Sequence, residues 1–337
     1  MKVNRNHLYL LLFAGVVALA AGALVRFGPL ADRASLPLAP TPTADIVQAR
    51  QAYDSGGALS YAEIIALQRE IVGEPPDSTQ IMDIEKYYDL YDEYITRAET
   101  FGNQLKNCRL KESVGWLARY GEAQNSDGVP VPGAWQVYVS MLDPYSGSGA
   151  DADEYPFINM YLTGIGEEQV AQLRQGQQVK FSGDLAEINP LTIENVKYEL
   201  LPDEFISPTA SPAELENFNV TLDRTMCFGA CPDYTVTVNG KGEVTFEGRH
   251  YTRVTGKVTA TIDQAKVAEI VRELHRADFF SLDSDYSIEV TDLPTITLTV
   301  QMGGRSKTVR EYGAGPQKLH ILQSRIDQIV NTQQWIK

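Results

Sequence analysis

The chain begins with a long apolar run that no charged residue interrupts. It extends from Leu8 to Val25, and Lys2 and Arg5 precede it. At about 1.5 Å per residue, a helix over this run is roughly 27 Å long, which suits the hydrocarbon core of a bilayer. Residues 1–27 are therefore predicted to be a signal anchor that stays in the cell membrane as a single transmembrane helix, or a signal peptide that is cleaved. We expect the downstream domains to be extracytoplasmic, or secreted if cleavage occurs.

Residues 28–44 contain four prolines, Pro29, Pro37, Pro40 and Pro42. Proline fixes φ and cannot donate a backbone hydrogen bond, so it disfavours both helix and sheet. We predict a semi-extended linker between the membrane segment and the first folded part.

Residues 45–105 show helical periodicity. Apolar positions recur at helical spacing up to Ile71, and Gly73 with Pro75 ends this pattern. A second run keeps steps of three and four residues through Ile81, Ile84, Tyr88, Tyr91, Ile95 and Ala98. We predict a helical stalk whose tyrosine-rich face serves packing or a partner.

Residues 106–201 have the pattern of β-strands. The strand-like segments are VGWLARY, AWQVYVSML, FINMYLTG, QQVKFSGDLAEI and LTIENVKYEL. One short helical segment, GEEQVAQLRQG, separates the third from the fourth. Five strands with a helix in this position are typical of the OB-fold, a small five-stranded β-barrel.

This middle region also resembles a known family. The segment from Ile158 to Leu200 is similar to the OB domains of the tRNA_anti-like family, and the resemblance covers about residues 100–201. It implies an OB-like barrel, a fold that often binds oligonucleotides or sugars, but it transfers no site residues. We interpret Trp116, Trp135 and Tyr138 as barrel core.

A linker rich in proline, serine and threonine, residues 202–216, leads to a second patterned region, residues 217–337. Four strand-like segments, a helix, two more strands and a closing helix follow one another there. This order predicts an antiparallel sheet with two helices on one face. The whole chain is expected to be an α+β multidomain protein.

The C-terminal region resembles the family of domains of unknown function numbered 6438. The matching motifs are LDRTMCFGACPDYTVTVNGKGEVTFEG from Leu222, ADFFSL from Ala277, TDLPT from Thr291, GGRSKTV from Gly303 and YGAGP from Tyr312. The order of these motifs carries the resemblance. Because the family has no assigned function, the resemblance implies none.

Cys227 and Cys231 form the most distinctive motif, Cys-Phe-Gly-Ala-Cys-Pro. In an oxidising compartment we expect a structural disulfide, since Gly229 lets the backbone bring the two sulfurs together. So small a loop adds about 2 kcal/mol at most. Two unpaired thiols in a turn are an alternative, and Cys108 is either buried or bridges two chains.

A thiol-redox or copper-handling site is another alternative. The C-x-x-x-C-P spacing resembles that of Sco-type copper chaperones, and thiolates select Cu(I). His250 is the candidate third ligand beside Cys227 and Cys231. Those chaperones have a helix after the motif, whereas strand-like DYTVTV follows here. The favoured interpretation therefore has no metal.

Six polar residues of the family motifs are candidates to line one cleft: Asp233, Tyr234, Asp292, Arg305, Lys307 and Tyr312. The favoured interpretation is that they are strand-end and turn residues that make hydrogen bonds. No nucleophile elbow, phosphate-binding loop or paired-carboxylate signature accompanies them. We assign no catalytic residue and no cofactor, and we favour a protein that is not an enzyme.

The charge balance limits the partners. With 29 Lys and Arg against 44 Asp and Glu, the chain carries −15, which argues against nucleic acid. We expect a non-enzymatic binding or interaction protein at the cell envelope. Its expected partners are the membrane, through the N-terminal helix, and an envelope protein or a glycan. A thiol-redox or copper-handling role is the alternative, and oligosaccharide binding on the OB-like barrel is the second.

Overall fold

The computed structural model describes residues 46–77, 81, 83–125, 129–145, 157–188, 191–203, 205 and 210–336. The predicted signal segment and the proline-rich linker lie outside these residues. Within the described ranges, no helix combines the length and the apolar character needed to cross a membrane. Residues 44–337 form one compact unit.

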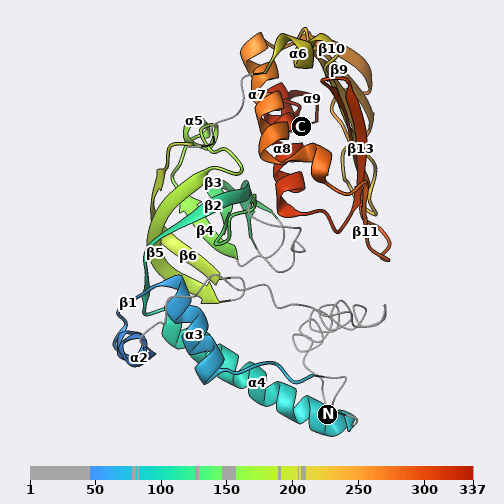
Figure 1. The fold of residues 1–337 in the computed structure, drawn as a ribbon. Helices are drawn as coiled ribbons and strands as arrows, with labels where there is room; N and C mark the ends of the chain where they lie inside the picture. The colour runs from blue at the N-terminus through green and yellow to red at the C-terminus, as the bar shows by residue number, and fades with distance from the viewer. Residues whose placement is uncertain are drawn as a thin grey trace. The chain divides into compact units, whose positions relative to one another are not determined.

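The first three described helices are α2 (Ile46–Ser55), α3 (Tyr61–Ile71) and α4 (Ile84–Leu105) (Figure 1). Ser60 caps α3 by accepting from the Glu63 N–H, and the Glu63 side chain accepts from the Ser60 N–H in return. The Asp83 side chain accepts from two N–H groups at the start of α4. These caps satisfy donors that a helix start leaves without partners. The predicted helical character of this region is confirmed.

Five strands close into a ring in the middle of the chain. They are β2 (Arg109–Gln124), β3 (Pro130–Ser140), β4 (Phe157–Thr163), β5 (Gln178–Ile188) and β6 (Leu191–Leu200). Their order is β2-β3-β4-β6-β5, and β5 pairs with β2 to close the ring. The sheet is mixed because β4 and β6 run parallel. The predicted short helix between the third and fourth strands is confirmed as α5 (Glu167–Val170), and β1 (Ala58–Leu59) adds a parallel edge to β2.

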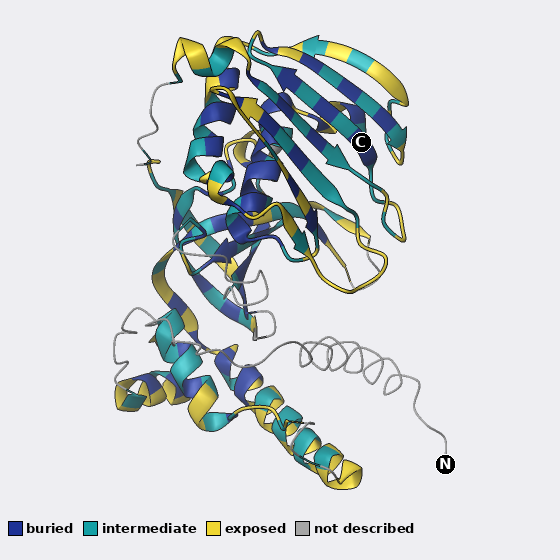
Figure 2. Cartoon of the chain, turned by 45° about the vertical axis from the view of Figure 1, so that its right-hand side comes forward, coloured by how far each residue is buried: buried dark blue, intermediate teal, exposed yellow. Residues whose placement is uncertain are grey.

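The N-terminal helices share their hydrophobic core with the ring. Leu67 of α3 and Phe101 of α4 belong to the same buried cluster as Leu117 and Phe181 of the ring. These helices are therefore part of the ring's core rather than a separate stalk, because periodicity identifies an apolar face but not the surface on which it packs. The N-terminal half of α4 has exposed and intermediate residues but no buried one, as the yellow and teal of Figure 2 show, and Tyr88 is 55% accessible.

A seven-stranded sheet and two long helices form the C-terminal part. The strands are β7 (Asn219–Arg224), β8 (Asp233–Asn239), β9 (Glu243–His250), β10 (Gly256–Thr261), β11 (Asp285–Ser287), β12 (Ile296–Met302) and β13 (Arg305–Tyr312). The helices are α6 (Pro212–Glu216), α7 (Gln264–Arg276), the 3-10 helix η2 (Phe279–Ser281), α8 (Gln317–Val330) and α9 (Gln333–Ile336). The sheet order is β10-β9-β8-β7-β12-β13-β11, and β11 runs parallel to β13. The predicted order of four strands, helix, two strands and helix is confirmed, with β11 and the short helices as additions.

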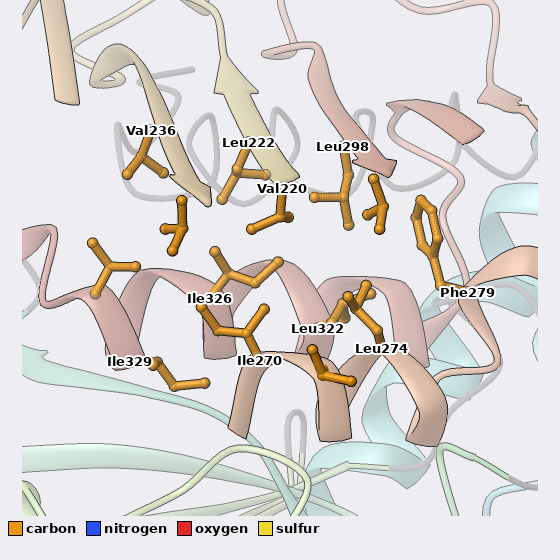
Figure 3. Packing of buried hydrophobic residues seen from close by; sticks show 14 of the residues in the cluster. Val220, Leu222, Val236, Ile270, Leu274, Phe279, Leu298, Leu322, Ile326 and Ile329 are labelled. Atoms are coloured by element: carbon orange, nitrogen blue, oxygen red, sulfur yellow. The ribbon is translucent and has the colours of Figure 1, made fainter. Parts of the chain in front are cut away.

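One face of this sheet packs on α7 and α8. Figure 3 shows Leu222 and Leu298 of the sheet facing Ile270 of α7 and Leu322 and Ile326 of α8. Alternation along each strand places these apolar side chains on one face. The two helices therefore lie where the sequence pattern predicts them.

The opposite face of the sheet is polar. Six threonines occupy consecutive partner positions across six strands: Thr259, Thr245, Thr237, Thr221, Thr299 and Thr308. Cross-strand threonine pairs stabilise a sheet by roughly 0.2–1 kcal/mol each. The sheet is mixed rather than purely antiparallel as predicted, because the short strand β11 runs parallel to β13. Its other six strands pair antiparallel, and such a sheet with one face on its core can leave the other face in water.

Ionic contacts join the ring to the C-terminal part. Asp203, in the predicted linker, accepts from Arg272 at 2.5 Å and from Arg276 at 3.1 Å. Burial alone would raise the pKa of Asp203, but the hydrogen bonds and the charges of these arginines hold it below its usual value. This part of the linker is therefore docked on α7 rather than acting as a free spacer.

Candidate functional site

A disulfide closes the connection between β7 and β8. Cys227 and Cys231 are bonded, and their Cα atoms are 5.5 Å apart, a separation typical of disulfides. The Gly229 N–H donates to the Cys227 carbonyl at 2.9 Å, which turns the chain back between the two sulfurs. The disulfide predicted for this motif is confirmed, and it restrains the residues that it encloses.

Residues 225–232 and 288–295 form two adjoining loops, which we call the paired loops. The Thr225 N–H donates to the Thr295 carbonyl at 3.0 Å, and the Thr295 N–H donates to the Thr225 hydroxyl at 2.9 Å. The loops extend the pairing of β7 with β12, whose last partners are Arg224 and Ile296. Two segments about 70 residues apart are thereby held together at one end of the sheet.

Five apolar side chains of the paired loops face solvent, and we call them the apolar patch. They are Met226, Phe228, Ile288, Val290 and Leu293, which are 49, 88, 40, 44 and 39% exposed. Phe228 is the most exposed of them, yet its backbone is fixed, because its N–H donates to the Asp292 carbonyl at 3.1 Å. A phenylalanine on a closed loop is thus presented to solvent in a restrained position.

Gly313 lies directly against two side chains of the apolar patch. A Cβ at this position would lie 2.6 Å from Leu293 Cδ1 and 2.9 Å from Ile288 Cδ1, and the backbone has φ +82°. Both conditions favour glycine. The neighbouring Tyr312 hydroxyl accepts from the Leu293 N–H at 3.4 Å. The end of β13 therefore positions the second of the paired loops.

An ion-pair network holds the strand that leaves the disulfide. Asp233 is buried and accepts from Arg249 at 2.6 Å and from His250 at 2.9 Å, while Arg249 also reaches Asp223 at 2.9 Å. Burial by itself would raise the pKa of Asp233, but the hydrogen bonds from His250 and Arg249 outweigh it and keep that pKa below the usual value. The start of β8 is therefore fixed within a few residues of Cys231.

Tyr234 points to the other side of the sheet, toward α8. Its hydroxyl donates to Asp327 at 2.8 Å, and Arg224 reaches the same carboxylate at 3.0 Å. Burial and the neighbouring Asp327 charge raise the pKa of Tyr234 well above its usual value. This hydroxyl fastens the sheet to α8 and is not available to a ligand.

The six residues predicted to line one cleft divide into two groups. Asp233, Tyr234, Asp292 and Tyr312 lie at the end of the sheet that carries the paired loops. Arg305 begins β13 and lies at the opposite end. At about 3.3 Å per residue, the length of β13 separates its two ends by roughly 23 Å. The structure therefore does not bring all six together.

The other two residues of the set contact the turn after α7. Lys307 donates to the Phe280 carbonyl at 3.0 Å and to the Leu282 carbonyl. The Arg305 guanidinium lies 3.9 Å from the centre of the Phe280 ring. These cations hold the connection between α7 and β11, which is a structural role.

The residues named for a copper site have other partners in the structure. Both sulfurs of Cys227 and Cys231 are engaged in the disulfide, and His250 directs its Nδ1 to Asp233. Across the described residues, no group of three or more His, Cys, Asp or Glu side chains is placed to hold a metal ion. Cys108 is buried beside the Tyr53 carbonyl, and burial raises its thiol pKa.

Sequence reasoning missed Phe228, Arg249 and Asp327 as members of this region. Phe228 lies inside the motif, and its exposure depends on the closed loop. Arg249 and Asp327 approach the motif only through strand pairing and helix packing across many residues. A single sequence carries no local signal for such contacts.

Comparison with known proteins supports the C-terminal resemblance. Residues 218–330 match the model of a domain of unknown function, DUF6438. The disulfide and both paired loops lie inside this match. The comparison gives no support to the tRNA_anti-like resemblance of the middle region. No curated protein matches the chain.

Proposed function

We propose that the protein is a membrane-tethered, extracytoplasmic, non-enzymatic module that binds another protein through the apolar patch. The observation that carries this proposal is the position of Phe228, which is 88% exposed on a loop closed by a disulfide. Four further apolar side chains are exposed on the same paired loops. Clustered apolar residues at a surface are typical of interaction sites.

Energetics favour such a site. Complete burial of a phenylalanine side chain yields about 1.5–3 kcal/mol relative to exposure. Because the disulfide and the hydrogen bond to Asp292 already restrain the loop, little conformational entropy is lost on binding. A few well-placed side chains commonly carry most of the energy of an interface. Phe228 is placed to be such a residue.

Charge defines the chemistry of the partner. Glu289 and Asp292 are exposed on the second of the paired loops, beside Val290 and Leu293. Complementary charge around an apolar centre speeds association and selects the partner. We therefore infer a partner protein with an apolar pocket bordered by lysine or arginine.

Two observations support the proposed extracytoplasmic location. The apolar run near the N-terminus suits a signal anchor, and stable disulfides are typical of oxidising compartments. We also propose that the ring of five strands is an OB-like barrel, since its order with one helix between the third and fourth strands is that of the OB-fold. A C-terminal fusion to a reporter that is active only outside the cytoplasm tests the topology. A full-length fusion whose reporter is inactive would contradict it.

Site-specific photo-crosslinking in cells tests the binding site. A photoreactive amino acid at Val290 of the full chain is expected to give a discrete protein adduct, which disappears in the Phe228→Ser variant. The matched control places the same amino acid at Lys257, on the edge strand β10, where no such adduct is expected. An adduct at Val290 that persists in Phe228→Ser, or an identified partner without a basic surface, would contradict the proposal.

A further inference from the structure

A cleft of about 740 Å³ lies where the ring meets α7 and α8. Its walls come from β2, β3 and the turn after α5 on one side, and from α7, α8 and α9 on the other. We propose that this cleft binds a neutral oligosaccharide. The proposal is independent of the apolar patch, whose residues do not line the cleft.

The first argument is the aromatic wall. Trp135 of β3 and Tyr120 of β2 both line the cleft and are half-buried. The Tyr120 hydroxyl donates to the Leu173 carbonyl at 3.0 Å, which fixes the ring in place. Aromatic rings present broad apolar faces, and the C–H faces of sugar rings stack on such surfaces.

The second argument is the supply of neutral hydrogen-bonding groups. Amide and hydroxyl side chains line the cleft: Gln175, Ser324, Gln328, Asn331 and Gln333. An amide side chain offers both donors and an acceptor. That of Gln328 already accepts from Arg325 at 2.6 Å and donates to the Tyr120 hydroxyl at 2.5 Å, so Gln175, Asn331 and Gln333 are the amides left for a ligand. Sugar hydroxyls also act in both ways, so this set suits a polyhydroxylated ligand.

The third argument is charge. Three basic and three acidic side chains line the cleft: Arg174, Lys266, Arg325, Glu122, Glu269 and Asp327. Three of these are already paired within the protein, since Arg325 binds Glu269 at 2.5 Å and Asp327 binds Arg224 at 3.0 Å. In a chain of net charge −15, a balanced cleft favours an uncharged ligand.

The volume of the cleft suits an oligosaccharide of a few sugar residues. Small-ligand sites typically measure about 300–1,000 Å³, and the cleft falls in this range. A second, smaller pocket of about 380 Å³ contains Trp116 and Arg276. There the Arg276 guanidinium already covers the Tyr145 ring at 4.2 Å. Trp116 therefore serves as the matched control for Trp135.

Binding of defined tetrasaccharides to the full chain tests the proposal. The probes are maltotetraose, cellotetraose and chitotetraose, with acidic tetragalacturonate for comparison. Saturation-transfer NMR and tryptophan fluorescence report binding. At least one neutral probe is expected to saturate, and Trp135→Ala is expected to weaken it about tenfold. Trp116→Phe is expected to leave the Kd unchanged.

The Gln333→Ala variant keeps the test decisive if Trp135→Ala fails to fold, because Gln333 is exposed in the free protein. A several-fold weaker Kd is expected for it. The proposal is overturned if no neutral probe binds, if tetragalacturonate binds more tightly than all three, or if Gln333→Ala leaves the Kd unchanged. Loss of binding in Trp116→Phe would also overturn it.

Discussion

Arg276, the last residue of α7, donates a hydrogen bond of 2.8 Å to the carbonyl oxygen of Gly176, although 100 residues separate the two in sequence. Its guanidinium also lies over the Tyr145 ring, 4.2 Å from the ring centre. The Arg276 guanidinium therefore contacts both the main chain of the turn before β5 and the side chain of Tyr145. This contact fixes the C-terminal part on the ring and, with it, the walls of the cleft.

We expect Gly176→Ala to destabilise this joint. Gly176 has φ +77°, and an added Cβ would overlap the Tyr145 hydroxyl and lie 3.0 Å from Ile321 Cγ2. The strained backbone and the overpacking together should lower the free energy of unfolding by about 2–4 kcal/mol. Urea unfolding measures this change.

Gly164→Ala is the matched control. Gly164 has φ +72°, nearly the same backbone conformation, but no atom lies within 4 Å of its added Cβ. Its expected cost is about 1 kcal/mol, from the backbone alone. Equal costs for the two variants would show that the side chains of Tyr145 and Ile321 do not obstruct a Cβ at position 176.

The Asp327 carboxylate is expected to be the centre of the contact between the sheet and α8. It accepts from Arg224, Tyr234 and Thr332. Asp327→Ala leaves the Arg224 charge without its partner, so it should cost about 3–5 kcal/mol. Tyr234→Phe removes one hydrogen bond and should cost about 1 kcal/mol. Thermal and urea unfolding compare the two, and a larger cost for Tyr234→Phe would contradict this ranking.

The disulfide is expected to add little to global stability. Cys227 and Cys231 are four positions apart, so the loop that they close restricts the unfolded chain only slightly. On the chain-entropy model, reduction should cost about 2 kcal/mol at most. Unfolding with and without reductant measures the cost, and a chain with both cysteines changed to serine is the control that reductant should not affect. A much larger cost would mean that the paired loops support the core.

The fold could be predicted in large part from local pattern. The alternation in β7, β8 and β12 and the apolar face of α7 identify elements that bury one side, and the structure has them in the predicted order. The helices of residues 45–105 were also predictable, but their packing was not. Phe101 and Leu105 join the ring's core, and no periodicity names the surface that receives such a face.

The candidate site was less predictable because it depends on pairings across the chain. The spacing of Cys227 and Cys231 predicts their disulfide from the sequence alone. Phe228, by contrast, meets Asp292 only because β7 pairs with β12. Lys307 belongs to the same family motifs but lies toward the far end of β13. Strand direction and register decide which motif residues meet, and a single sequence does not state them.

Acid should weaken the protein partly through Asp233. The hydrogen bonds from His250 and Arg249 keep its folded pKa below the usual value, whereas the unfolded chain has the usual value of about 3.9. Its contribution to stability is therefore complete above the unfolded pKa and is lost as the pH falls through the folded pKa. Asp233→Asn should be less stable than the wild type at pH 7, by about 1–3 kcal/mol.

The difference in unfolding free energy between the wild type and Asp233→Asn should shrink as the pH falls from about 5 toward 2, because protonation removes the same charge from the wild type. Urea unfolding at each pH measures this difference. Asp89→Asn, on an exposed position of α4, is the matched control and should change stability by less than about 0.5 kcal/mol at pH 7. If the difference for Asp233→Asn stays constant or grows in acid, the carboxylate does not hold the start of β8 through its charge.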